Sequence, residues 1–568
     1  MDIEQALEIV DAALKPDSLN KLDIILFRQA WDGKSYEEIA ASSGYDVGHV
    51  KNVGAQLWKK LSCALGQRVT KTNFCCVLYR YAEIPNLQQQ ASAKRNIKNL
   101  FLKPNSVPQQ DWGESIDVSY FYGRTTELAK LEQWIKKENC RLIALLGMGG
   151  IGKTVLSVKL AQQLQGEFEY VIWRSLRHAP PVEEKLGKIL QFLFDNQPIV
   201  RNINEGISEL VNFLQEHRCL LILDNIESIF QRGELAGKYG QAFQGYGELF
   251  KRMGEGLSKS CLVLTSREKP KEVAVLEGEA LPVRCLQLSG LQLAEIPHLF
   301  NFKGNFSASA SDWEIIEKYC AGNPLILKML ATQIQELFDG NVSYFISLWQ
   351  QGEIRFENIY ELLEEQVSRC SELEKEVLYW LAVNRRSVTL LELRNKILSW
   401  ETRQKLPVVL MSLERRSLIL KTSFGFTLIP VLMDYITNLI IQAITQEIKH
   451  NNKRLIYLIQ LLQPQASREI QAEQINLILE PIVENLRKEF SSYKELKALL
   501  ENILSEMRSQ VSKLLGYGEI NISYLKKVAV ITNPKIQLVA HNHYPEPIAD
   551  EIVCYPVSST IGSGINYF

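Results

Sequence analysis

The chain has 568 residues, a formal net charge of -1 and 46% apolar residues, a composition typical of a globular protein with several cores. The balanced charge excludes general electrostatic attraction to nucleic acid or membranes, so any such partner would have to meet a local patch. The acidic amphipathic N-terminus does not resemble a signal peptide, and no apolar run has the length of a membrane span. Ten cysteines lack metal-binding spacing, so we expect free thiols in a cytoplasmic protein without a membrane partner.

Residues 1–85 are expected to form a helix-turn-helix or adaptor domain. Apolar residues recur at helical spacing in four short stretches. Ser35 and Glu38 form a capping-box pattern before the third stretch, and Asp46 precedes the fourth. A longer helix after a short glycine-containing turn is typical of the helix-turn-helix motif.

Residues 86–119 are rich in Gln, Asn, Pro and Ser, which predicts a linker. Short apolar runs then alternate with helical segments over 120–285. The runs are RLIALLG (141–147), YVIWRSL (170–176), LLILD (220–224) and CLVLTSR (261–267). This alternation predicts a parallel, doubly wound sheet with helices on both faces.

The remainder of the chain is expected to be mainly helical, which makes the whole a multidomain α/β plus α protein. The sequence pattern of residues 286–370 predicts a helical domain. Residues 371–445 predict three helices and a hairpin that turns between Thr422 and Gly425, the pattern of a winged helix. Residues 446–520 predict a helical bundle, and residues 521–568 a short mixed tail of strands and turns.

The segment GMGGIGKT (147–154) predicts a phosphate-binding loop, because it follows a buried strand and opens a helix. Its glycines allow backbone N–H groups to wrap the phosphates, and the start of the helix adds the positive end of its dipole. Lys153 is then placed to reach the β- and γ-phosphates, and Thr154 to bind Mg²⁺.

Two further side chains are candidates for this site. Asp224 ends the run LLILD, and we expect it on a neighbouring strand of the sheet, facing the metal. Arg267 ends the run CLVLTSR, where a cation could sense the γ-phosphate through charge-assisted hydrogen bonds. Each residue alone is also common on ordinary surfaces, so the prediction depends on their conjunction with the loop.

The motifs of residues 120–445, taken in order, resemble the NB-ARC branch of the STAND signalling ATPases. FYGRTTEL (121–128), the loop, VIWRSLR (171–177), LLILDN, LTSR and GNPLIL (322–327) each match a family motif. The resemblance implies ATP or ADP with Mg²⁺ as ligands, and a metal site of Thr154 and Asp224. It implies nucleotide contacts from Tyr122, Gly123, Arg124, Gly147, Gly149, Gly150, Ile151, Gly152, Lys153, Thr154, Val155 and Pro324.

Two positions depart from the family pattern. The second acid that follows the metal-binding aspartate is Asn225 here, an amide that is a poor proton acceptor. Glu227 is the possible substitute, so the expected catalytic set is Lys153, Asp224, Glu227 and Arg267, with slow ATP hydrolysis at most. The family's His-Asp sensor in the winged helix is replaced by Ile429-Pro430.

The resemblance implies a signalling switch that opens and self-associates in its ATP form, with an unknown protein partner or signal. One alternative is an ATP-dependent transcription regulator, because ten basic residues and one acid, Glu83, give +9 between Lys51 and Lys103. The residues that could face a groove are His49, Lys51, Asn52, Gln56 and Lys59. By fold analogy we favour an adaptor over a DNA-binding role. Another alternative is a scaffold without turnover, since no WD or pentapeptide repeats follow the bundle.

Overall fold

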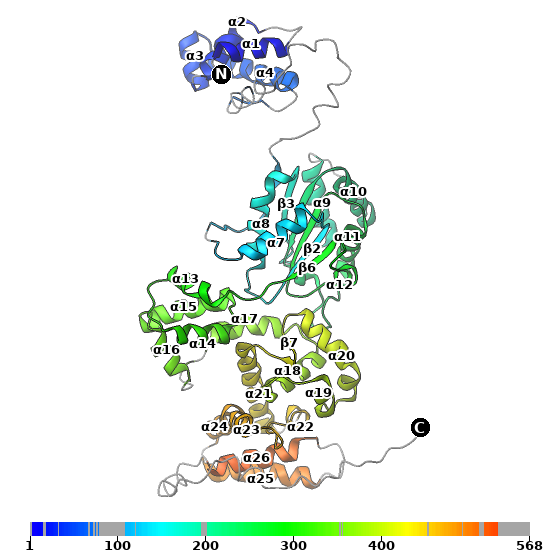
Figure 1. The fold of residues 1–568 in the computed structure, drawn as a ribbon, viewed down its shortest axis with the longest axis vertical. Coiled ribbons are helices and arrows are strands. Elements are labelled where there is room, and N and C mark those ends of the chain that lie inside the picture. The colour runs from blue at the N-terminus through cyan, green and yellow to red at the C-terminus, as the bar shows by residue number, and fades with distance from the viewer. Residues whose placement is uncertain are drawn as a thin grey trace. The chain divides into compact units, whose positions relative to one another are not determined.

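The computed structural model describes residues 3–14, 19–31, 33–65, 69–71, 74, 78, 108–119, 121–194, 202–350, 354, 356–450, 454–490, 492–509 and 516–531 (Figure 1). The chain divides into two compact units, residues 1–105 and 106–568. Most of the predicted linker lies outside the described residues, as does the tail from residue 532. The same holds for six of the basic residues counted above, Arg68, Arg80, Lys94, Arg95, Lys98 and Lys103.

The N-terminal unit contains the four predicted helices, α1 (Ile3–Leu14), α2 (Lys21–Trp31), α3 (Tyr36–Ser43) and α4 (Val47–Leu65). The expected capping box is present, because the Glu38 N–H donates to Ser35 Oγ at 3.2 Å and the Ser35 N–H donates to the Glu38 carboxylate at 2.6 Å. Asp46 accepts from the N–H of Gly48 at 2.8 Å at the start of α4. Large apolar side chains from α2 and α4 close the core of this unit.

The second unit begins with a six-stranded, all-parallel sheet in the order β1-β3-β4-β5-β2-β6. Its strands are β1 (Gln109–Asp111), β2 (Leu142–Leu146), β3 (Tyr170–Ser175), β4 (Cys219–Asp224), β5 (Cys261–Ser266) and β6 (Val283–Gln287). Helices α7 (Thr125–Lys136) and α8 (Lys153–Leu164) pack on one face. Helices α9 (Val182–Leu193), α10 (Ile203–Glu216), α11 (Gln244–Glu255) and α12 (Lys271–Leu276) lie on the other (Figure 1). The predicted doubly wound sheet is confirmed.

The sheet corrects the sequence analysis in two respects. Asp224 does not lie on a strand next to the phosphate-loop strand, because β5 separates β4 from β2. Two strands were also missed: β1 lies within the segment expected as a linker, and β6 continues past residue 285. The sequence did not predict β1 because three polar residues on a sheet edge show no apolar pattern.

Helices dominate the rest of the second unit, and none of those in the described ranges combines the length and apolar content of a bilayer span. The first group comprises α13 (Ile296–Asn301), α14 (Ala310–Cys320), α15 (Pro324–Phe338), α16 (Val342–Gln350) and α17 (Glu357–Val367). The second comprises α18 (Glu372–Asn384), α19 (Leu390–Lys396), α20 (Trp400–Arg415) and α21 (Pro430–His450). The third comprises α22 (Leu455–Leu458), α23 (Arg468–Gln474), a π-helical turn (Ile475–Leu479), α24 (Glu480–Glu489), α25 (Tyr493–Ser509) and α26 (Gly518–Ile531).

The predicted hairpin is present as β7 (Leu420–Thr422) and β8 (Gly425–Thr427), with Thr422 paired to Gly425. The expected strands and turns in the tail are wrong for residues 521–531, which belong to α26. The β-branched run VAVI resembles a strand, but Leu525 and Val528 are buried as α26 packs beside α25 (Figure 1). Tertiary packing therefore overrides local propensity here.

Candidate nucleotide site

The phosphate loop connects the end of β2 to the start of α8. Gly150 and Gly152 adopt left-handed φ angles of +79° and +100°, which favour glycine. A Cβ atom on Gly150 would lie 2.6 Å from the Cβ of Leu325, so the loop is in close contact with the start of α15. The loop is thus both sharply bent and enclosed by residues from a later helix.

Lys153 is 7% exposed at the first position of α8. Its ammonium donates to the carbonyl oxygens of Gly147 at 2.7 Å and Met148 at 3.0 Å. Among the described residues, no carboxylate forms an ion pair with it. Burial lowers the pKa of Lys153 to about 8, although the nearby Glu227 and Asp224 carboxylates oppose this shift. A buried cation held only by neutral carbonyls is suited to pair with an incoming anion.

Thr154 and Asp224 are brought together. Oδ1 of Asp224 accepts from Thr154 Oγ1 at 2.8 Å and from Thr265 Oγ1 at 2.5 Å. Thr265 lies on β5, so the strand between β4 and β2 supplies a hydroxyl group to Asp224. Burial raises the pKa of Asp224, although these hydroxyl bonds oppose the shift. A hydroxyl and a carboxylate are the oxygen donors that Mg²⁺ prefers, so these residues fit the implied metal.

Glu227 and Arg267 are paired with each other. Arg267 Nε lies 3.2 Å from Glu227 Oε1, and the Arg267 N–H donates to Glu227 Oε2 at 3.3 Å. Arg267 also forms an ion pair with Glu365 at 3.1 Å. Its guanidinium carbon would be 3.2 Å from a Cβ atom on Gly149, so the cation lies beside the phosphate loop. The amide of Asn225 donates to Asp224 at 2.7 Å and offers no base.

The segment 122–124 also contacts the phosphate loop, through Arg124. Arg124 is buried, and it donates to the carbonyl oxygen of Ile151 at 3.0 Å and to Glu127 at 2.7 Å. The Tyr122 ring is 38% exposed and lies 5.3 Å from the His298 ring, centroid to centroid. Gly123 adopts a φ of +70° and a Cβ atom there would collide with the Glu295 carboxylate. Ile151 and Val155 pack into the core on this face of the sheet.

Two residues that sequence reasoning missed bind the loop directly. Asn323 caps α15 just before Pro324, and its Nδ2 donates to the carbonyl oxygen of Gly149 at 2.9 Å. Gln366 in α17 accepts from the Gly149 N–H at 3.1 Å through Oε1. Both side chains are buried. An Asn before Pro at a helix start is an N-cap signal that could have revealed Asn323, whereas no local pattern marks Gln366.

Four buried charges form a second connection, named here the ion cluster: Glu268, Arg369, Glu374 and Arg416. Glu268 Oε1 lies 2.7 Å from Arg369 Nε and 2.6 Å from Arg416 Nη1, and Arg416 Nε lies 2.9 Å from Glu374 Oε1. None of the four is more than 6% exposed. Glu268 follows β5, Arg369 follows α17, Glu374 lies in α18 and Arg416 follows α20. The cluster therefore joins the sheet to two later groups of helices.

A glycine-rich loop between a buried parallel strand and a helix, with Lys153 inside it and a Thr-Asp pair beside it, defines a P-loop nucleoside-triphosphatase fold. Comparison with models of known protein families shows which kind of P-loop domain this is. The NB-ARC domain model matches residues 124–232, and the model of the vWA-MoxR associated protein N-terminal HTH matches residues 1–81. The chain thus contains an NB-ARC domain that follows an N-terminal helix-turn-helix domain, as the motifs predicted.

The chain is also similar to proteins of several organisms. An uncharacterized WD repeat-containing protein of Nostoc sp. is 42% identical over 461 residues, which are 74% of this chain and 37% of that protein. A disease resistance protein of Vitis rotundifolia is 27% identical over 35% of this chain and 14% of its own length. This chain spans little more than a third of the first relative and less of the second. A solved Walker-type ATPase of Pyrococcus abyssi aligns with 58% of this chain and 99% of its own, at 17% identity and a TM-score of 0.39.

Proposed function

We propose that this protein is a nucleotide-operated signalling switch of the NB-ARC type. The observation that carries the proposal is the double engagement of Gly149, whose N–H and carbonyl groups bond Gln366 and Asn323 from later helices. A change of occupancy at the phosphate loop would therefore act directly on α15 and α17. A ligand shifts such an equilibrium only by its differential contacts with the two arrangements.

The roles within the site follow from chemistry. The loop N–H groups and the Lys153 ammonium would bind the phosphates of ATP or ADP, and Arg124 would hold the loop in shape through Ile151. Thr154 and Asp224 would hold Mg²⁺, which when bound neutralises charge on the phosphate oxygens.

The same site favours slow turnover. Asn225 cannot accept a proton usefully, and the Glu227 carboxylate is already engaged by Arg267. Arg267 would have to leave Glu227 before it could bind a γ-phosphate. We infer a slow ATPase whose ADP form is closed, and whose ATP form opens and self-associates.

Hydrogen–deuterium exchange of the full chain, loaded with ADP or with a non-hydrolysable ATP analogue, tests the coupling. We expect amides of α17 and of the segment after β5 to exchange faster with the ATP analogue, because Gln366 and Arg267 leave their partners. Lys153→Ala should remove the difference between the two ligands. Equal exchange in the wild-type chain under both conditions would contradict the proposal.

A DNA-binding regulator is the second candidate, because His49, Lys51, Asn52, Gln56 and Lys59 are all exposed on α4. The Lys51–Glu37 ion pair at 2.8 Å is exposed and weak, so it does not prevent phosphate contact, and the preference for an adaptor rests on fold analogy. We therefore retain an adaptor role toward a protein partner. Fluorescence anisotropy of the full chain with duplex DNA should detect no salt-dependent affinity, and a steep salt dependence would favour the regulator instead.

A further inference from the structure

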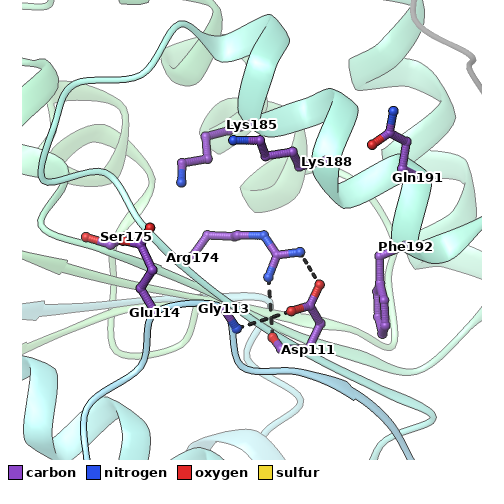
Figure 2. Close-up of a pocket in the computed structure, with 9 residues that line it drawn as sticks. All are labelled: Asp111, Gly113, Glu114, Arg174, Ser175, Lys185, Lys188, Gln191 and Phe192. Carbon is purple, nitrogen blue, oxygen red and sulfur yellow. Dashed lines mark hydrogen bonds and ion pairs between the residues drawn. The ribbon is translucent and has the colours of Figure 1, made fainter. Parts of the chain in front are cut away.

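A hollow of about 410 Å³ lies at the carboxyl edge of the sheet, away from the phosphate loop (Figure 2). It is bordered by the ends of β1 and β3, the turn after β1, and α9. Strands β4 and β5 separate β3 from the phosphate-loop strand β2. At a strand spacing of about 4.8 Å, the two sites are roughly 14 Å apart across the sheet.

Arg174 provides a fixed cation in this hollow. It is buried, donates to the Trp173 carbonyl oxygen at 2.9 Å, and forms an ion pair with Asp111, as Figure 2 shows. Although burial opposes the shift, the Arg174 hydrogen bond and charge hold the pKa of Asp111 below its usual range. The Asp111 carboxylate is therefore committed to Arg174 and does not neutralise the other cations.

Two lysines from α9 add to this charge. Lys185 and Lys188 lie about one helical turn apart, and both line the hollow on the same side as each other in Figure 2. Lys188 pairs with Glu184 at 2.6 Å, but both side chains are half exposed, so this pair is weak. Lys185 has no side-chain hydrogen bond or ion pair to another described residue. Burial and the charge of Lys188 lower the pKa of Lys185, although the carboxylates of Glu114 and Glu184 oppose this shift.

The charge balance favours an anionic ligand. Asp111 neutralises Arg174, so the net positive charge comes from Lys185 and Lys188. The exposed carboxylates of Glu114 and Glu184 offset these two lysines only weakly. Lys185 is the fourth residue of α9, at the end of its first turn, where the positive end of the helix dipole adds to its field. A phosphate group is the chemistry that cations lining one hollow recognise best.

The far end of the hollow is different in character. Phe192 lies seven residues after Lys185 on α9, about 10 Å along the helix axis at 1.5 Å per residue. Gln191 adds amide donors and acceptors to the lining of the hollow, with its side chain pointing away from the ring in Figure 2. A cationic end and an aromatic end, in a hollow within the usual size of small-molecule sites, match a flat ring joined to a phosphate.

We propose that this hollow binds a small phosphorylated molecule of the nucleoside monophosphate class, with its phosphate at Lys185 and Lys188 and its ring against Phe192. The site is separate from the phosphate loop and gives the chain a second ligand. Ser175, which lines the hollow, is paired across β3 and β4 with Asp224, so the two sites share adjacent strands.

Calorimetric titration of the full chain with AMP tests the proposal. We expect one AMP per chain, bound equally by wild type and by Lys153→Ala, because the phosphate loop takes no part. Lys185→Ala and Lys188→Ala should each weaken AMP binding by about tenfold, the usual effect of losing a charge-assisted hydrogen bond. Lys251→Ala, which removes an exposed lysine from α11 on the same unit, is the matched control and should have no effect.

The Phe192→Leu variant distinguishes the contribution of the ring to AMP binding from that of the phosphate. It should weaken AMP binding while leaving the affinity for inorganic phosphate unchanged. Circular dichroism confirms that each variant is folded. The proposal is overturned by no binding at millimolar AMP, by loss of AMP binding in Lys153→Ala, or by AMP affinities that the two lysine variants leave unchanged. An equal loss of AMP and phosphate affinity in Phe192→Leu would refute the assigned orientation.

Discussion

The phosphate loop and the ion cluster both connect the sheet to later helices, but they do so with different chemistry. The loop uses neutral groups, the Asn323 and Gln366 amides, on backbone atoms of Gly149. The ion cluster uses full charges that are at most 6% exposed. Neutral hydrogen bonds exchange at little net free energy, whereas separation of buried ions leaves uncompensated charge.

This difference assigns distinct tasks to the two connections. A phosphate oxygen can replace Gln366 Oε1 as the acceptor of the Gly149 N–H, so this contact suits the nucleotide-dependent part of a switch. The ion cluster would resist opening, and it would set the free energy that a ligand must supply to separate the helices from the sheet. Four substitutions or conditions test this division, in decreasing order of expected effect.

Glu268→Gln should have the largest effect, because it leaves Arg369 and Arg416 buried without their shared anion. We expect a loss of about 3–5 kcal/mol in the free energy of unfolding, measured by urea denaturation with circular dichroism. Glu401→Gln, which breaks the exposed Lys405–Glu401 pair, is the control and should cost at most about 1 kcal/mol. If both variants unfold at the same urea concentration, the cluster does not act as a clamp.

Lys153→Ala should weaken ADP binding by about 100-fold, the upper range for loss of charge-assisted bonds to phosphate. The fold should remain, because the ammonium has no ion-pair partner among the described residues. Equilibrium titration with ADP measures the loss. Lys159→Ala, from the same helix, is the control and should bind ADP as the wild type does. An unchanged ADP affinity in Lys153→Ala would contradict the assignment of the phosphate site to this loop.

The pKa of about 8 for Lys153 predicts a pH dependence. A bound phosphate raises this pKa, so ADP affinity should be constant below pH 8 and fall above it, by up to about tenfold per pH unit. Because the folded pKa lies below the unfolded value, this group makes the ligand-free protein more stable as pH rises from about 8 to about 10.4. ADP titrations across this range measure the affinity, and a flat profile that matches Lys153→Ala would contradict the assignment.

Gln366→Ala should have the smallest effect. It frees the Gly149 N–H, so ATP-analogue affinity should rise by about threefold, in line with one neutral hydrogen bond. Gln366→Glu should lower the affinity, because a carboxylate would repel phosphate. Gln333→Ala, on α15, is the matched control. A decrease in affinity for Gln366→Ala would show that this amide assists the ligand rather than competing with it.

The sequence predicted the parts of the site that depend on local pattern or strand direction. The loop is contiguous, and the proximity of Thr154 to Asp224 follows because the carboxyl ends of parallel strands share one edge. The strand between them was not predictable from the runs alone, since sheet order is a tertiary property. The roles of these residues in binding and hydrolysis stay predictions.

The contacts that hold the loop to later helices could not be read from the sequence. Gly149 and Gln366 are 217 residues apart, and Glu268 and Arg416 are 148 apart. A Gln or Arg in an amphipathic helix is usually a solvated side chain, and nothing local marks those that are buried. The prediction for the residues of α26 was wrong for the opposite reason, because its β-branched run is a strong local signal for a strand although the segment is helical.

The most direct test of the switch is the mass of the full chain in solution with each nucleotide, measured by light scattering during size-exclusion chromatography. We expect a species near the chain mass of 64.9 kDa with ADP, and a multiple of that mass with a non-hydrolysable ATP analogue. Identical mass and identical small-angle scattering with both ligands would contradict it.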